Sequence, residues 1–155
     1  ISGQAGLPTR WSATENVVWK TPLPGPGTSS PILVGDKIYL TAYSGYNVPG
    51  EPGDMQNLKR HLVALDRQSG KLLWKEDIAA KLPEQERIRD DHGYASSTPA
   101  SDGERIYCFF GKSGAMAFDL AMPKCLMGSS SMPDGLRIST SESFSPTTSF
   151  RPSRR

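Results

Sequence analysis

One short stretch of the chain, Gly111-Lys112-Ser113, has residue types that bind phosphate in many proteins. In a phosphate-binding loop, backbone amides after a strand surround the phosphate oxygens while the lysine neutralises their charge. That motif needs another glycine five residues before Gly111, but the residue there is Ile106. The stretch also lies between two predicted strands and does not precede a helix. We therefore interpret it as a turn.

A second stretch, Asp90-Asp91-His92, carries side chains that ligate metals. Adjacent side chains point in different directions, and the sequence offers no second cluster that would complete a coordination sphere. We therefore predict a polar connecting loop without a metal site, and keep ligand binding at this loop as the alternative. The sequence also holds no Ser-His-Asp set that its spacing supports, so we predict no catalytic residue.

The two cysteines, Cys108 and Cys125, do not have the spacing of a metal site. Cys108 lies in a strand-like run, where a small buried apolar side chain serves equally well. We do not expect a disulfide between them, because Cys125 lies in a segment that we predict to be unfolded.

The predicted strands that would position these residues occur in repeated units along the chain. Such a repeat indicates the fold more directly than any single motif does. Residues 29–39 return in similar form as residues 97–107. The matched positions are Pro31 with Pro99, Gly35 with Gly103, and Tyr39 with Tyr107. Each copy has a short strand, a glycine turn and a second strand with aromatic and β-branched residues. Both copies therefore predict hairpins.

A second repeated element follows the first. Residues 62–66 predict a strand, residues 67–70 a turn and residues 71–74 the returning strand. The Asp66 side chain can accept hydrogen bonds from the turn backbone, and Gly70 supplies a positive φ without steric cost. Residues 116–120 begin the same element again, and residues 17–20 match its closing strand.

The spacing Ala64-x-Asp66-x-x-Ser69-Gly70-x-x-x-Trp74 closely resembles the PQQ-like β-propeller repeat. Flanking blocks such as residues 7–12 and 95–100 are similar to a group of such propellers in planctomycete-type bacteria. The resemblance implies an all-β, WD40-like fold, a partial β-propeller of about two four-stranded blades. The expected structural repeat residues are Ala64, Asp66, Gly70, Trp74 and Trp19. Both tryptophans would fill the space between neighbouring blades, since blades stack to bury their faces.

This organisation divides the chain into three parts. Residues 1–28 form an N-terminal segment with the closing strand at 17–20, and residues 29–120 form the blades. The blades include a predicted surface loop at 44–60 and a connector at 79–89. Residues 121–155 are rich in serine and lack periodicity, which predicts disorder. Because the repeat pattern breaks after Leu120, we expect a changed reading frame or a truncated gene there. A natural disordered tail is the alternative.

Composition excludes several function classes for this chain of 155 residues with a net charge of +2. Five of the basic residues and two of the acidic ones lie from Ala121 onward, so the basic excess belongs to the tail. A nucleic-acid site needs clustered Lys and Arg on a folded surface, and we expect none. No run approaches the ~18 apolar residues of a membrane span. The chain begins with Ile1, so it starts after processing or is a fragment.

The resemblance implies a non-catalytic scaffold for protein partners, similar to the outer-membrane assembly lipoprotein, in the periplasm or cell envelope. Alternatives are a fragment of a PQQ-dependent dehydrogenase, a sensor region associated with a serine/threonine kinase, and a product without function in this form. In quinoprotein dehydrogenases the quinone is held by a vicinal disulfide, a Trp floor and a calcium site. None of these can be placed here, so no PQQ is expected. A small-molecule ligand, if any, stays unknown.

Overall fold

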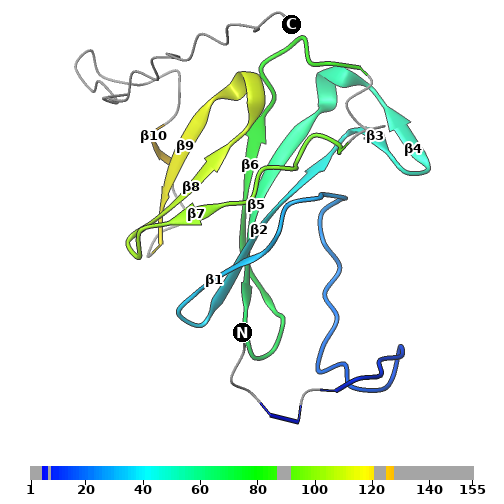
Figure 1. The fold of residues 1–155 in the computed structure, drawn as a ribbon. Helices are drawn as coiled ribbons and strands as arrows, with labels where there is room; N and C mark the ends of the chain where they lie inside the picture. The colour runs from blue at the N-terminus through cyan, green and yellow to red at the C-terminus, as the bar shows by residue number, and fades with distance from the viewer. Residues whose placement is uncertain (1–4, 7, 87–91, 121–124, 128–155) are drawn as a thin grey trace, which may run out of the picture.

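The computed structural model describes residues 5–6, 8–86, 92–120 and 125–127, and this part of the chain is all-β. Its strands form two four-stranded sheets and one small two-stranded sheet, all antiparallel. The helical elements among these residues are two single 3-10 turns. Within the same residues, no helix is long and apolar enough to cross a membrane. Figure 1 shows the two larger sheets facing each other, as two blades of a partial β-propeller do.

The first sheet has the strand order β1-β2-β5-β6 and confirms the predicted four-stranded unit. Its strands are β1 (Ile32–Val34), β2 (Lys37–Ser44), β5 (Lys59–Asp66) and β6 (Leu72–Ala79). The β1–β2 turn needs a left-handed residue, which Gly35 supplies with φ +58°. Alternation of side chains along β2 and β5 places one set of residues on each face of the sheet.

The second sheet has the order β10-β9-β8-β7. Its strands are β7 (Ala100–Ser101), β8 (Arg105–Phe109), β9 (Ala115–Asp119) and β10 (Cys125–Met127). The expectation that the second unit ends at Leu120 is wrong for β10, where Cys125 pairs with Phe118. An edge strand bonds through its backbone and needs no repeat motif, so the sequence pattern did not reveal it. The other residues of the predicted tail lie outside the described ones.

The segment predicted as a surface loop at 44–60 contains a small hairpin. Strands β3 (Tyr46–Val48) and β4 (Glu51–Gly53) pair, and the 3-10 turn η1 (Met55–Asn57) leads into β5. Asp54 caps that turn by accepting a hydrogen bond from the Gln56 amide at 2.8 Å. The glycines and prolines that suggested a loop instead supply the turns of this hairpin, with φ +84° at Gly50.

Residues 17–20 were predicted to be a closing strand, and the structure assigns them to no sheet among the described residues. A strand is defined by a partner along its edge, and this segment pairs with none of the described strands. The segment instead reaches the turn between β5 and β6, where Trp19 makes its contacts. The prediction of a strand is therefore wrong here, whereas the tryptophan still lies against a blade.

One buried cluster joins the two larger sheets. Tyr39, Leu62 and Ala64 of the first sheet pack with residues of the second sheet, all fully buried or nearly so. The second-sheet members are Ile106, Cys108, Phe110 and Phe118. Removing each large apolar side chain from water is worth roughly 1.5–3 kcal/mol, so this contact is the main source of stability between the sheets.

Candidate functional site

The repeat residues of the first sheet form the β5–β6 turn. The Asp66 carboxylate accepts hydrogen bonds from the Ser69 amide at 2.8 Å and from the Ser69 hydroxyl at 2.6 Å. These bonds, chiefly the one from the hydroxyl, lower the pKa of Asp66 below its ordinary value. Gly70 has φ +69°, a conformation that suits glycine. The turn is therefore held in one shape by its own side chains.

Trp19 lies directly against Gly70. A Cβ atom at Gly70 would stand 2.3 Å from Cε3 of the Trp19 ring, so only glycine leaves room for the indole. The Trp19 indole N–H donates to the Arg67 carbonyl at 3.1 Å, and the Thr21 hydroxyl donates to the Gly70 carbonyl. These contacts hold the N-terminal segment against the first sheet. A tryptophan of a preceding blade would pack against the next blade in a similar way.

Trp74 lies on strand β6. It pairs across the strands with Ala64, which is fully buried, and its ring centroid is 5.7 Å from that of Tyr39. A side chain larger than alanine at position 64 would meet the neighbouring core. In the structure, the five predicted repeat residues thus lie either in packing contacts or in the β5–β6 turn.

The face of the second sheet that corresponds to this buried face is uncovered. Tyr39 is fully buried, whereas its repeat counterpart Tyr107 is 37% exposed, and Phe109 on the same strand is 56% exposed. The register Tyr107–Ala117 and Phe109–Ala115 places these side chains on one side of the sheet. We call the row Ala100, Tyr107, Phe109 and Ala115 the open face; Ala117 on the same side of the sheet is only 3% exposed. Tyr107 and Phe109 are thus the exposed aromatic residues of this face.

A cavity with aromatic and charged lining residues lies at one end of the sheets. Register puts the ends of β2, β5 and β6 side by side there, so residues 45–58 and 80–86 meet at this end, where Arg60 also contacts Tyr94. The cavity has a volume of about 170 Å³. Its lining includes Arg60, Glu84, His92, Ser96, Phe109 and Gly111. Long connections on a rigid sheet are where binding sites occur most often.

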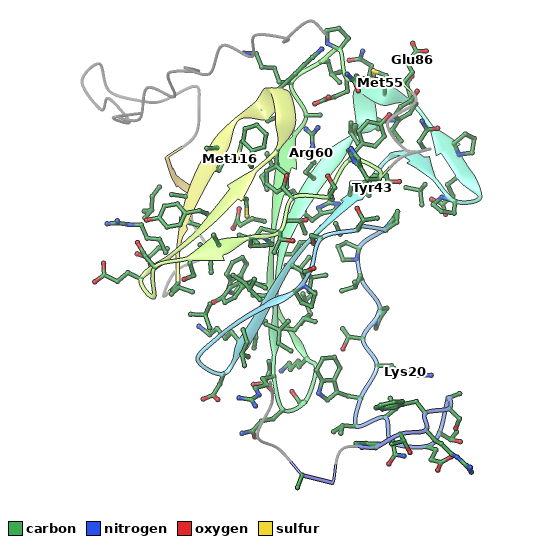
Figure 2. The ribbon with its side chains drawn as sticks, viewed as in Figure 1. Lys20, Tyr43, Met55, Arg60, Glu86 and Met116 are labelled. Atoms are coloured by element: carbon green, nitrogen blue, oxygen red, sulfur yellow. The ribbon has the colours of Figure 1, made fainter. Side chains whose placement is uncertain are left out.

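Arg60 is the central residue of this cavity. Its side chain is only 3% exposed and forms an ion pair of 2.6 Å with Glu84, whose side chain is 5% exposed. The guanidinium also donates to the Tyr94 carbonyl at 2.9 Å and to the Ser113 hydroxyl at 3.3 Å. Figure 2 shows Arg60 between the two sheets, with Tyr43 on the β2 side and Met116 on the β9 side. A buried charge pair needs such partners, because desolvation is costly.

The structure brings together a Ser-His-Asp array that the sequence analysis did not find. His61 Nδ1 is 2.9 Å from Asp77 and His61 Nε2 is 2.8 Å from the Ser44 hydroxyl. Burial is the largest influence and lowers the pKa of His61, against the opposing effect of Asp77. Sequence spacing could not reveal the array, because the residues meet across three strands, with His61 opposite Asp77. Only the pairing register of β2, β5 and β6 brings these three residues together.

This array joins strands, and we interpret it as structural. The His61 side chain is 2% exposed, and Asp77 also pairs with Lys75 at 2.7 Å. Neither described cavity is lined by Ser44. A catalytic serine needs space for a substrate beside its hydroxyl, in addition to its hydrogen bonds with the histidine and the aspartate. The array therefore ties β2, β5 and β6 together.

The other residues considered for chemistry lie as follows. Gly111, Lys112 and Ser113 form the 3-10 turn η2 (Gly111–Ser113) between β8 and β9, which confirms the interpretation as a turn. Asp90 and Asp91 lie outside the described residues, whereas His92 is exposed and lines the cavity. Among the residues that the structure describes, no group of acidic, His and Cys side chains could hold a metal.

Neither cysteine forms a disulfide in the described part of the chain. Cys108 is buried between the sheets, and burial raises the pKa of its thiol to about 12. A thiol in that state is a packing group and not a nucleophile. Cys125 is exposed on the edge strand β10.

Comparison with known proteins identifies the family. The family model described as outer membrane protein assembly factor BamB matches residues 3–121. No curated protein matches the chain. The matched residues include the whole first sheet, strands β7, β8 and β9 of the second sheet, and the Trp19 contact. The chain therefore belongs to the PQQ-repeat family described as outer membrane protein assembly factor BamB.

Proposed function

We propose that this chain is a non-catalytic propeller segment that binds another polypeptide through the open face of its second sheet. One observation carries this proposal. The first sheet buries Tyr39 under the second sheet, while the counterpart Tyr107 and its neighbour Phe109 are 37% and 56% exposed. Exposed apolar surface in a monomer is typical of interaction sites, and this exposure supports docking at the open face.

The partner that fits is a β-sheet with a row of branched and aromatic apolar side chains. The chain itself supplies the precedent, because the matching face of the first sheet is covered by Ile106, Cys108 and Phe118. Sheets that pack face to face interdigitate such rows at a separation of ~10 Å. Aromatic side chains at the centre of an interface contribute most of its binding energy. Tyr107 and Phe109 are therefore the expected anchors.

The family description supports a role in assembly. That description names the assembly of outer membrane proteins, which supports a protein-binding role. It also supports our proposal that the chain works in the cell envelope, in the periplasm. The His61 imidazole is 2% exposed and links Ser44 and Asp77 across three strands, and this structural role supports a non-catalytic function.

The described residues do not fit the quinone cofactor that the name of the repeat suggests. The cavity of about 170 Å³ is smaller than the roughly 300–1,000 Å³ of sites that hold molecules of that size. Its single buried cation, Arg60, is already paired with Glu84, and that carboxylate would repel the carboxylates of the quinone. We therefore derive no redox step for this chain.

A site-specific photocrosslinker tests the docking surface. Benzoylphenylalanine replaces Tyr107 in one variant and Leu33, 52% exposed on the first sheet, in the control. In the cells that make the protein, we expect crosslinks from position 107 to alternate residues of one strand in a partner. Adding Phe109→Asp should reduce this crosslinking at least tenfold, because a charge in an apolar contact costs over ~1.4 kcal/mol. Equal crosslinking from positions 107 and 33 would contradict the proposal.

A further inference from the structure

We propose that the cavity beside the Arg60–Glu84 pair is an amide-binding site, which takes a carboxamide or peptide amide carried by the docked partner. This inference rests on the proposed function, because the partner on the open face would deliver the amide. Phe109 belongs to both places, since it lies on the open face and lines the cavity. A group that projects from a partner on that face would thus find the cavity next to it.

The volume of the cavity indicates the size of the ligand. At about 170 Å³ it is smaller than the roughly 300–1,000 Å³ of sites for drug-sized molecules. It holds one amino-acid side chain or one peptide unit. A single group of a larger partner therefore fits better than a complete cofactor.

Arg60 provides the hydrogen-bond donors. A guanidinium has five N–H groups, and the described partners Tyr94, Ser113 and Glu84 accept three bonds. The Cβ position of Gly111 lies 3.9 Å from Nη2, the same nitrogen that donates to Glu84. By this count two of the five N–H groups are left for an acceptor in the cavity. A carbonyl oxygen is such an acceptor.

Glu84 provides the acceptor and sets the charge of the ligand. Its carboxylate has about four lone-pair positions, and Arg60 donates to one of its oxygens at 2.6 Å. An amide matches both partners, because its C=O accepts from Arg60 while its N–H donates to Glu84. A carboxylate ligand would be repelled by Glu84 and an ammonium ligand by Arg60. The pair therefore selects a neutral group that both donates and accepts.

The walls favour a planar group. The Arg60 Cζ atom lies 6.0 Å from the centroid of the Phe110 ring, so the guanidinium and the ring border the same space. Tyr94, Phe109 and Phe110 line the cavity with aromatic surface. A flat amide packs against such surfaces with little loss of conformational freedom. A diol has matching hydrogen-bond groups without that flat shape.

A series of small probes tests the site by NMR. We expect propionamide to shift the amide signals of Gly93, Tyr94, Phe110 and Gly111 saturably. Propionate, propylammonium and propane-1,2-diol should bind at least tenfold more weakly. In Ser96→Leu, which fills the cavity, the shifts should disappear while the other signals keep their dispersion. Val18→Leu, at an exposed site on the N-terminal segment, is the matched control and should respond as the native chain. Equal shifts by propionamide and propionate would overturn the proposal.

Glu84→Gln is the most informative variant, because it removes the negative charge beside Arg60. This variant should bind propionate more tightly than propionamide. A Glu84→Gln variant that still prefers propionamide would contradict the role of Glu84. If this variant does not fold, Ser96→Leu still decides whether the cavity binds the probe.

The crosslinker at position 107 separates this inference from the proposed function. Ser96→Leu leaves the open face intact, and it should lower crosslinking because the partner loses its amide contact. Unchanged crosslinking in Ser96→Leu would show that the amide is not carried by the partner. Crosslinking without any propionamide shifts would remove the amide site alone. Shifts without any crosslinking would instead remove the proposed function.

Discussion

The two larger sheets come from one repeat but differ in what covers them. In the first sheet, Tyr39 is fully buried beneath the second sheet, and Trp19 rests on the Gly70 turn. In the second sheet, the strand β8 buries Ile106 and Cys108 on one side and exposes Tyr107 and Phe109 on the other. The same pattern of strands thus buries Tyr39 in one unit and exposes its counterpart Tyr107 in the other. The difference arises from position in the stack and not from a change of fold.

This comparison shows that matched positions of a repeat can be buried in one copy and exposed in the next. A blade cannot bury both faces alone, so each copy depends on a neighbour. Substitutions at matched positions should therefore have unequal effects in the two sheets. The following experiments use that inequality.

The largest effect is expected from Phe118→Ala. Phe118 is fully buried between the sheets, and removing its ring leaves a cavity that should cost about 3–5 kcal/mol of unfolding free energy. Phe109→Ala removes the same ring from the open face, where it is 56% exposed, and should cost far less. Urea denaturation of both variants measures the difference. Equal losses would show that the two faces do not differ as described.

Gly70→Ala should have the next largest effect, because its Cβ would overlap the Trp19 ring and its φ of +69° is strained for alanine. We expect a loss of about 2–3 kcal/mol, from backbone strain and overpacking together. The control is Gly35→Ala, where φ is +58° but no atom lies within 4 Å of the new Cβ, so only the strain remains. Trp19 fluorescence should shift to longer wavelength in Gly70→Ala alone. A similar stability loss in both variants would contradict the Trp19 contact.

Stability should fall when the pH drops below about 6.5, the ordinary pKa of histidine. Burial lowers the pKa of His61 in the folded chain, so the unfolded chain binds the proton first and acid favours unfolding. The stability is complete above that pH and declines toward the lower folded pKa. The nearby charges are Asp77, which opposes the shift, and Lys59 and Lys75, which add to it.

His61→Gln tests this dependence. We expect a flatter slope of unfolding free energy between neutral and mildly acidic pH, measured by urea denaturation at several pH values. His92→Gln, at an exposed position, is the control and should keep the native slope. An unchanged slope in His61→Gln would mean that other groups cause the pH dependence.

The smallest effect on stability is expected from Tyr107→Ser on the open face, within ~0.5 kcal/mol of the native chain. The same change should reduce binding of a hydrophobic dye, because it removes an exposed aromatic ring. Leu33→Ser changes an exposed residue of the first sheet and should leave dye binding nearly unchanged. Equal dye binding by all three proteins would argue against a specific apolar surface.

The sequence predicted the parts of the fold that depend on local pattern. The glycine turns and the repeated hairpins were visible because Gly35 and Gly70 need backbone conformations that other residues disfavour. The position of Trp19 against a blade followed from the repeat, although the strand predicted around it did not form. The edge strand β10 was missed because its pairing with β9 is made by the backbone.

The candidate sites could be predicted only in small part. His61, Ser44 and Asp77 meet through cross-strand register, which spacing along one strand does not show. Arg60 and Glu84 come from a strand and a distant connector, so their ion pair depends on the folded path of the chain. Sequence patterns predict what alternates within a strand, whereas these contacts depend on which strands become neighbours.

Oxidative footprinting of Tyr107 by hydroxyl radicals tests the central claim most directly, with Tyr39 and Leu33 as internal references. In the purified chain, Tyr107 and Leu33 should react while Tyr39 is protected, as their exposed fractions of 37%, 52% and 0% require. In intact cells, Tyr107 should become protected while Leu33 stays reactive, because the partner covers the open face. Tyr107 that reacts equally in both settings would contradict the claim that this face binds a partner.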